Sequence, residues 1–312
     1  MSHNATLATP ASATRSGTLA GIGLMLFGIF LFSVNDVMGK WLVATYAVGQ
    51  VLLLRSLAAL LVLGIIIWHR RERVAIPPQP GLHAVRVTLS TLEVACFYWA
   101  VAYLPLADVM TYYLAGPIYV AAFATLWLGE RLDRKRVAVI AFGFIGVLIA
   151  LRPSSATLTL PALIALAGSV FFALLMITTR KLKETADTTL VLGQTLGALL
   201  FGIVAAPFAW VPPSALDFSL LSLLGIVAMA AHLCVNRSLK LAPASVVAPY
   251  QYTLLVWAVI FGYFIFGDVV QPWTLIGAAV ICTAGFVLLL MDREDARREK
   301  TGDIPPPVLP EA

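Results

Sequence analysis

The feature that most constrains this chain is the order in which apolar segments and basic residues follow one another. Ten apolar runs, most of about 20 residues, cover 17–38, 47–68, 84–103, 108–128, 137–151, 159–179, 189–210, 218–236, 244–266 and 272–291. An α-helix rises about 1.5 Å per residue, so about 20 residues cross roughly 30 Å of hydrocarbon. We therefore predict an all-α integral membrane protein with ten transmembrane helices.

The basic residues predict how these helices are oriented. Of the 21 Lys and Arg residues, 18 lie in or beside the amino-terminal segment, every second loop and the carboxy-terminal segment. The other three are Lys40 and Arg152, in the alternate loops, and Arg55, inside a span. Because cytoplasmic loops carry an excess of Lys and Arg, we expect both termini in the cytoplasm and the chain in the inner membrane of a bacterium.

The composition argues against several other classes of protein. Only 12% of the residues are charged, against about 25% in soluble domains, and little loop is left for a soluble domain. The net charge of +5 lies in short clusters beside the spans, where it suits anionic lipid, so we expect no nucleic-acid partner. Cys96, Cys234 and Cys282 lack metal-ligand spacing, and no phosphate-binding loop or hydrolase motif is present. We therefore expect no cofactor and no enzyme.

The chain contains an internal repeat. Leu104 matches Leu241 at an offset of 137, and a Gly-acid pair at 129–130 matches another at 267–268. A Gly-Gln pair also recurs, at 49–50 and 193–194. These matches predict five helices in 17–151 and five in 159–291, after a cytoplasmic segment 1–16 and before a disordered tail 292–312. Since five is odd, the second half enters the membrane from the opposite side, as in inverted-repeat transporters.

The ten helices, the repeat and the Gly-Glu-Arg-Leu sequence at 129–132 resemble the EamA-like branch of the drug/metabolite transporter superfamily, over residues 17–291. The resemblance implies a cavity lined by the first, third, fourth, sixth, eighth and ninth helices, and transport without ATP hydrolysis. Asn-Asp-Val-Met-Gly-Lys at 35–40 and Ala-Pro-Tyr-Gln-Tyr at 248–252 are similar to segments of S-adenosylmethionine uptake carriers. Compact riboflavin importers are built on the same plan.

Two charged residues lie at similar depth on the two helices of the first predicted hairpin. Asp36 and Arg55 are at similar distances from the turn near 43–46, so an ion pair between them is plausible. The pair either locks the two helices or leaves Asp36 to contact a cationic substrate or a proton. Lys40, one turn after Asp36, competes as its partner, and Asn35 fits both interpretations.

Glu93 lies about 10 Å inside the third predicted span, with no cation within one turn of its own helix. A carboxyl group at that depth is either protonated or faces a water-filled cavity. Glu93 is therefore a candidate proton carrier or substrate contact, and the alternative is a neutral Glu that joins helices.

Polar and aromatic residues complete the set of candidates. Tyr113, Tyr250 and Gln251 suit stacking and hydrogen bonding to a planar ring, while His232 and Asn236 could bind substrate or move protons. Asp108 is predicted to be a first-turn acid of its helix. Five aromatic residues near span ends are assigned to the interfacial aromatic belt: Tyr98, Trp99, Tyr103, Trp127 and Trp210.

These features predict a secondary active transporter of a small organic metabolite. Riboflavin or a similar vitamin is the first choice, because tyrosines and amides suit an uncharged ring. S-adenosylmethionine uptake is the second, with Asp36 or Glu93 opposite its sulfonium, and export of amino acids or toxic metabolites the third. Proton coupling and a homodimer are left open. A lipid-processing membrane enzyme and a passive channel are the rival classes.

Overall fold

The computed structural model describes residues 11–71, 77, 79–116, 119, 134–151, 159–182, 184–241 and 248–301. These residues form ten α-helices and two 3₁₀ helices and contain no strand, which confirms the predicted all-α class for this part of the chain. In order, the elements are α1 (Ala11–Val43), α2 (Val48–Arg70), α3 (Pro80–Val101), α4 (Leu106–Leu114), α6 (Arg134–Leu151), α7 (Leu160–Lys181), α8 (Asp187–Ala205), η1 (Ala206–Ala209), α9 (Ala215–Leu241), η2 (Ala248–Tyr252), α11 (Thr253–Phe266) and α12 (Pro272–Thr301).

Six of these helical segments are long and apolar enough to cross a membrane. They are Leu19–Val43, Val48–Arg70, Pro80–Val101, Leu160–Thr179, Asp187–Ala209 and Ala215–Ser238. Three shorter apolar helices cover Val137–Ala150, Tyr250–Phe266 and Pro272–Val287. Much of the predicted 108–128 span lies outside the described residues, and so do Trp127 and the Gly-Glu-Arg-Leu sequence.

The helix ends follow local sequence signals. Pro80 opens α3, where a missing backbone N–H costs nothing. The Thr159 hydroxyl accepts a hydrogen bond from the backbone N–H of Ala162 and caps α7. Gly267 ends α11 at a φ of +68°, a left-handed conformation that glycine adopts without strain. This turn brings Asp268, the acid of the second Gly-acid pair, to the helix end.

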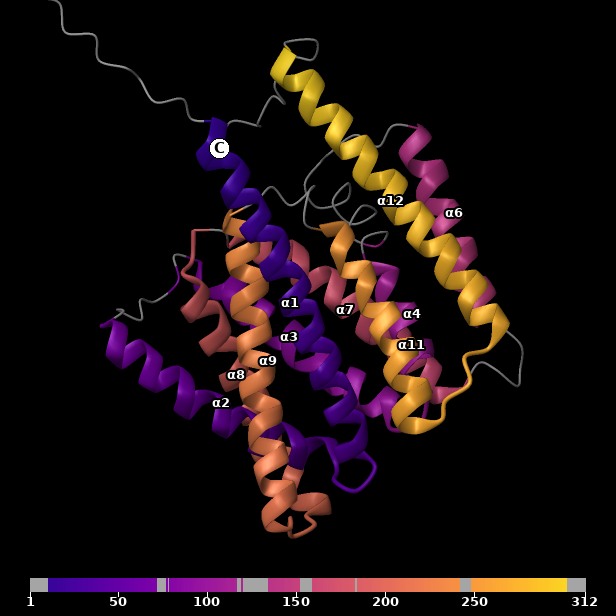
Figure 1. Cartoon of the computed structure of the whole chain (residues 1–312). Helices are drawn as coiled ribbons and strands as arrows, with labels where there is room; N and C mark the ends of the chain where they lie inside the picture. Colours follow the sequence, from indigo (N-terminus) through magenta and orange to yellow (C-terminus); the bar gives the residue numbers. More distant parts are fainter. Residues whose placement is uncertain are drawn as a thin grey trace, which may run out of the picture.

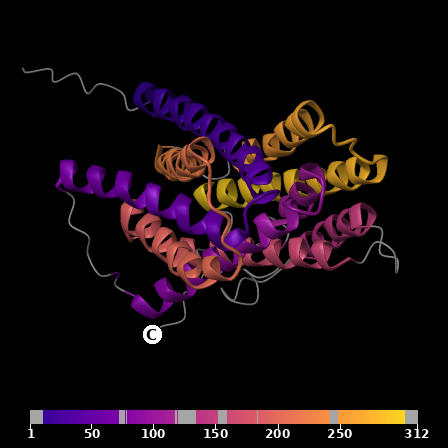
Figure 2. The ribbon, with the colours of Figure 1, turned by 90° about the horizontal axis from the view of Figure 1, so that it is seen from below.

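Helices of the first half pack mainly against helices of the second (Figures 1 and 2). The first helix of each half packs against the third of the other, giving the pairs α1–α9 and α7–α3. The second, fourth and fifth helices pair with their own counterparts, as α2–α8, α4–α11 and α6–α12. Exchanging the two halves leaves this set of pairs unchanged, as a twofold relation between them requires. In both views α2 and α12 lie toward opposite sides of the bundle.

The two glutamines that the repeat aligns hold opposite ends of the bundle. Near the α1–α2 turn, Gln50 Nε2 donates to the Val211 carbonyl at 2.6 Å, and the Val211 N–H donates to Gln50 Oε1 at 2.9 Å. At the opposite end, Gln194 Oε1 accepts a hydrogen bond from Arg86 Nη2 at 3.1 Å. Arg86 also donates to the Thr179 hydroxyl and the Leu190 carbonyl, and thereby joins α3 to α7 and α8.

Candidate functional site

Polar residues from four helices meet inside the bundle. They are Asn35 and Asp36 on α1, Arg55 on α2, Glu93 and Tyr98 on α3, and Tyr113 on α4. We call these six residues the polar cluster. The side chain of Tyr98 is completely buried, and Asn35, Asp36 and Tyr113 are each less than a tenth exposed. Charged groups so far from water are costly inside a membrane unless they are paired or bind a ligand.

Tyr98 is the centre of this cluster. Its hydroxyl accepts a hydrogen bond from Arg55 Nη1 at 2.6 Å and another from Asn35 Nδ2 at 3.2 Å. Asn35 Nδ2 also donates to Asp36 Oδ1 at 3.2 Å, while Asn35 Oδ1 is buried without a partner among the described residues. The guanidinium carbon of Arg55 lies 5.1 Å from the centre of the Tyr98 ring. A single phenol therefore connects α1, α2 and α3.

The predicted direct ion pair between Asp36 and Arg55 is wrong. The guanidinium donates to Tyr98 instead, so Arg55 and Asp36 interact without direct contact and are joined by hydrogen bonds through Tyr98 and Asn35. The phenol can enter because Gly39, one turn after Asn35, leaves space for it: a Cβ at Gly39 would overlap the Tyr98 ring. Tyr98 is completely buried and its hydroxyl bonds to Arg55 and Asn35, so its assignment to the interfacial aromatic belt is also wrong.

Lys40 does not compete for Asp36 either. Its ammonium forms an ion pair with Asp268 and lies 4.5 Å from the centre of the Phe266 ring. Close by, Asp108 in the first turn of α4, as predicted, accepts a hydrogen bond from the Thr274 hydroxyl at 2.8 Å. Together these contacts tie α1 to the α11–α12 loop and α4 to α12, at the end of the bundle that holds the α1–α2 turn.

Glu93 finds its neighbours on other helices. Its carboxyl group interacts electrostatically with Asp36 and with Arg55. The Tyr113 hydroxyl donates to the Glu93 backbone carbonyl at 3.3 Å. Within the polar cluster, two carboxyl groups therefore share one guanidinium, so the cluster has an excess of acid.

Aromatic rings border the polar cluster. Phe97 packs edge-on against both Tyr98 and Tyr113, with ring centres 5.5 Å apart in each pair. The ring centre of Phe172, on α7, lies 6.0 Å from that of Tyr113. The cluster is thus flanked by rings on α3, α4 and α7, which can contact a planar substrate.

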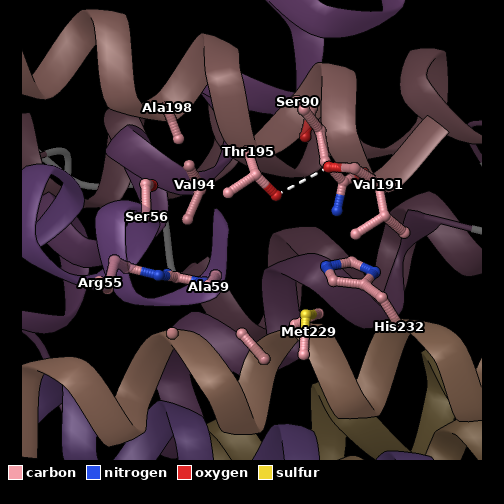
Figure 3. Close-up of a pocket in the computed structure, with 13 residues that line it drawn as sticks. Arg55, Ser56, Ala59, Ser90, Val94, Val191, Thr195, Ala198, Met229 and His232 are labelled. Carbon is pink, nitrogen blue, oxygen red and sulfur yellow. Dashed lines mark hydrogen bonds between the residues drawn. The ribbon is translucent and has the colours of Figure 1, made fainter. Parts of the chain in front are cut away.

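A small cavity adjoins Arg55 between α2, α3, α8 and α9, with a volume of about 50 Å³ (Figure 3). Arg55 and Ser56 lie on one side of it in this view, and Met229 and His232 on the other. The His232 ring also packs edge-on against Phe32, with centres 4.8 Å apart. His232 is thus brought close to Arg55, which belongs both to the polar cluster and to the cavity wall.

Three predicted site residues lie apart from this group. Tyr250 packs beside an apolar cluster formed by Met25 and Ile29 of α1. Gln251 and Asn236 are partly buried, and neither makes a hydrogen bond to another residue in the described part of the chain. Among the described residues no group of three or more His, Cys, Asp or Glu could hold a metal ion.

Helices of membrane-spanning length, packed around charged residues that avoid the lipid, define a multi-pass membrane transporter. The chain belongs to the EamA-like transporter family, whose profile matches it twice, over residues 19–152 and 159–291. This membership confirms the resemblance to the drug/metabolite transporter superfamily.

Two curated relatives and one solved structure are similar along nearly the whole chain. An S-adenosylmethionine uptake transporter of Rickettsia felis is 25% identical, over 90% of this chain and 96% of its own. A pseudopaline exporter of Pseudomonas aeruginosa is 26% identical, over 86% and 95%. A crystal structure aligns with a TM-score of 0.61 at 17% identity, covering 89% of this chain and 98% of its own, and supports the fold alone.

Proposed function

We propose that this protein is a secondary active transporter that carries S-adenosylmethionine, or a closely related cationic metabolite, into a bacterial cell across the inner membrane. In this proposal, residues 17–151 and 159–291 are two inverted five-helix halves that expose a shared site to each side in turn. The observation that carries it is the excess of carboxyl groups in the polar cluster, where Asp36 and Glu93 share Arg55.

The chemistry of S-adenosylmethionine fits this cluster in two ways. Its sulfonium is a permanent cation, which would balance the second carboxylate without a protein side chain. Its adenine ring is planar and could pack against Phe97, Tyr98 or Tyr113, whose rings lie against one another. A cation and a flat ring in one molecule therefore match the two kinds of group that the helices bring together.

Riboflavin, the first choice from the sequence, gains no support. Its uncharged ring would leave the acid excess unbalanced, and the Rickettsia and Pseudomonas relatives are named for other substrates. One of them is named for uptake and the other for export, so the inward direction of transport rests on the S-adenosylmethionine relative alone.

Uptake by purified protein in proteoliposomes tests the proposal. We expect labelled S-adenosylmethionine to enter with saturable kinetics, without ATP, and to be displaced by unlabelled S-adenosylmethionine. S-adenosylhomocysteine, which has a neutral thioether in place of the sulfonium, should compete at least about tenfold less well, because it lacks the sulfonium and keeps only its α-ammonium as a cation. Equal competition would contradict the role of the acid excess, and uptake proportional to concentration would indicate a channel.

Glu93 provides the test of proton coupling, which belongs to the same proposal. If its carboxyl group binds and releases the coupled proton, Glu93→Gln should stop accumulation against a gradient and preserve exchange of labelled for unlabelled substrate. Glu184→Gln, at an exposed acid between α7 and α8, is the matched control and should behave as the wild type does. Full accumulation by Glu93→Gln would exclude a role for this carboxyl group in coupling.

A further inference from the structure

The cavity beside Arg55 differs in chemistry from the polar cluster. Thirteen residues line it and none is an Asp or Glu. Its polar groups are one guanidinium, one imidazole, one amide and three hydroxyls: Arg55, His232, Gln194, Ser56, Ser90 and Thr195. The charged groups that act on His232 are Arg55 and Arg86, both cations. Among the described residues, the cavity wall thus carries a guanidinium and no acid, and it adjoins the polar cluster through Arg55.

Several of these groups lack a partner in the described part of the chain. Ser56 is 3% exposed and Ser90 is 9% exposed, yet neither hydroxyl makes a hydrogen bond there. The Arg55 guanidinium gives one hydrogen bond, to Tyr98, which leaves its other N–H groups free. These three residues line the cavity, so a group bound there could pair with their hydroxyls and N–H groups, as polar groups inside proteins normally are. Donors around a small cavity with no acid in its wall are suited to an anion.

The size of the cavity limits which anion it can hold. A cavity needs roughly 10–15 Å³ of free space to hold one water, so a volume of about 50 Å³ accepts a few waters, or a small polar group in their place. A carboxylate is such a group, and its two oxygens match the parallel N–H groups of a guanidinium.

We propose that this cavity binds the carboxylate group of an amino-acid-derived substrate, with Arg55, Ser56 and Ser90 as its donors. The inference rests on the proposed transport function and narrows its substrate class to compounds with both a cation and a carboxylate. The cationic group lies toward Asp36 and Glu93, and Arg55 borders both positions. S-adenosylmethionine is one such compound, and the free amino acids are others.

Paired ligands provide the test on the full-length protein in detergent. Thermal unfolding is measured with S-adenosylmethionine and with each free amino acid, and then with the decarboxylated amine of each compound. We expect at least one acid to raise Tm, and its amine to give a clearly smaller shift at the same concentration. Equal shifts from an acid and its amine, or no shift from any acid, would overturn the proposal.

Two hydroxyl deletions sharpen the assignment. The double change Ser56→Ala and Ser90→Ala should raise Kd for the stabilising acid about tenfold or more, and leave Kd for its amine as it was. Ser219→Ala removes an exposed hydroxyl on α9 and serves as the matched control. An unchanged Kd for the acid in the double variant would remove these serines from the site, whereas Arg55→Lys should weaken binding of the acid even though the positive charge remains.

Transport assays separate this inference from the one on which it rests. Saturable uptake of decarboxylated S-adenosylmethionine at the wild-type rate for the parent compound would contradict the carboxylate site and leave the transport proposal intact. Carboxylate-dependent binding, without entry of the ligand into proteoliposomes, would support the carboxylate site and contradict the transport proposal.

Discussion

The Tyr98 hydroxyl lies 2.6 Å from Nη1 of Arg55, so a neutral phenol, and not a carboxylate, directly contacts the guanidinium. A direct ion pair with Asp36 would neutralise both charges and leave little for a substrate to gain. With Tyr98 between them, Arg55 is positioned while its charge remains available to a ligand anion, and Asp36 remains available to a cation. The phenol thus keeps the guanidinium and the Asp36 carboxyl group out of direct contact.

Tyr98→Phe should destabilise the protein, because it leaves N–H groups of Arg55 and Asn35 unpaired in the interior. Each buried donor without a partner costs about 1–3 kcal/mol, so we expect a clear fall in Tm in detergent. Adding Arg55→Met should cost less than the sum of the single changes, since both disrupt one contact. Tyr103→Phe, at a residue that is 65% exposed, is the control. Strict additivity would indicate that the hydrogen bond contributes nothing.

The ion pair of Lys40 and Asp268 can be tested by exchanging its charges. Lys40→Asp and Asp268→Lys each place like charges together in a half-buried site, so each should lower Tm and the yield of folded protein. The double variant restores opposite charges and should recover at least half of the loss. A double variant that is less stable than either single variant would contradict the ion pair.

Gly225 allows α9 to approach α2 closely. A Cβ at this position would overlap the backbone carbonyl of Arg55, which cannot move without shifting α2. Gly225→Ala should therefore cost about 1–3 kcal/mol or more and reduce the folded fraction in size-exclusion chromatography. Gly64→Ala, on α2 with no atom within 4 Å of the added Cβ, should be tolerated. Similar losses from both changes would point to a general effect of helix glycines.

The orientation of the chain is open to a reporter assay. Because 18 of the 21 basic residues lie on one predicted side, alkaline phosphatase fused after Lys300 should be inactive, as it is in the cytoplasm. The same enzyme inserted after Pro213 should be active, as it is in the periplasm. Activity in the first fusion would overturn the count of ten spans and the inverted repeat with it.

The sequence predicts the helical class and the set of buried charges because both depend on local composition. Runs of apolar residues need no partner to be recognised, and an Asp, Glu or Arg within such a run is conspicuous. The partners of those charges depend on how helices far apart in the sequence meet, which composition does not encode. Depth alone pairs Asp36 with Arg55, whereas in the structure Tyr98 reaches both helices from α3.

One signal of this arrangement is present in the sequence. Tyr98 lies five residues inside the predicted 84–103 run, deeper than an interfacial belt, and Gly39 marks a place on α1 where a large side chain can approach. The contact of Lys40 with Asp268 has no comparable signal, because 228 residues separate the two. The repeat favours Tyr250 as a site residue, but in the structure this residue contributes to apolar packing.

The hydrogen bonds of Gln50 and Arg86 at the two ends of the bundle affect how easily either end can separate. An end closed by apolar side chains would cost about 25 cal/mol for every Å² exposed to water. Where Gln50 meets the Val211 backbone, and where Arg86 meets Gln194, separation exposes groups that water hydrates well. Hydrogen bonds to water would therefore replace much of the bonding lost on separation. Hydrogen bonds of this kind can hold each end closed while adding less to the free energy of opening than apolar contacts of the same area would.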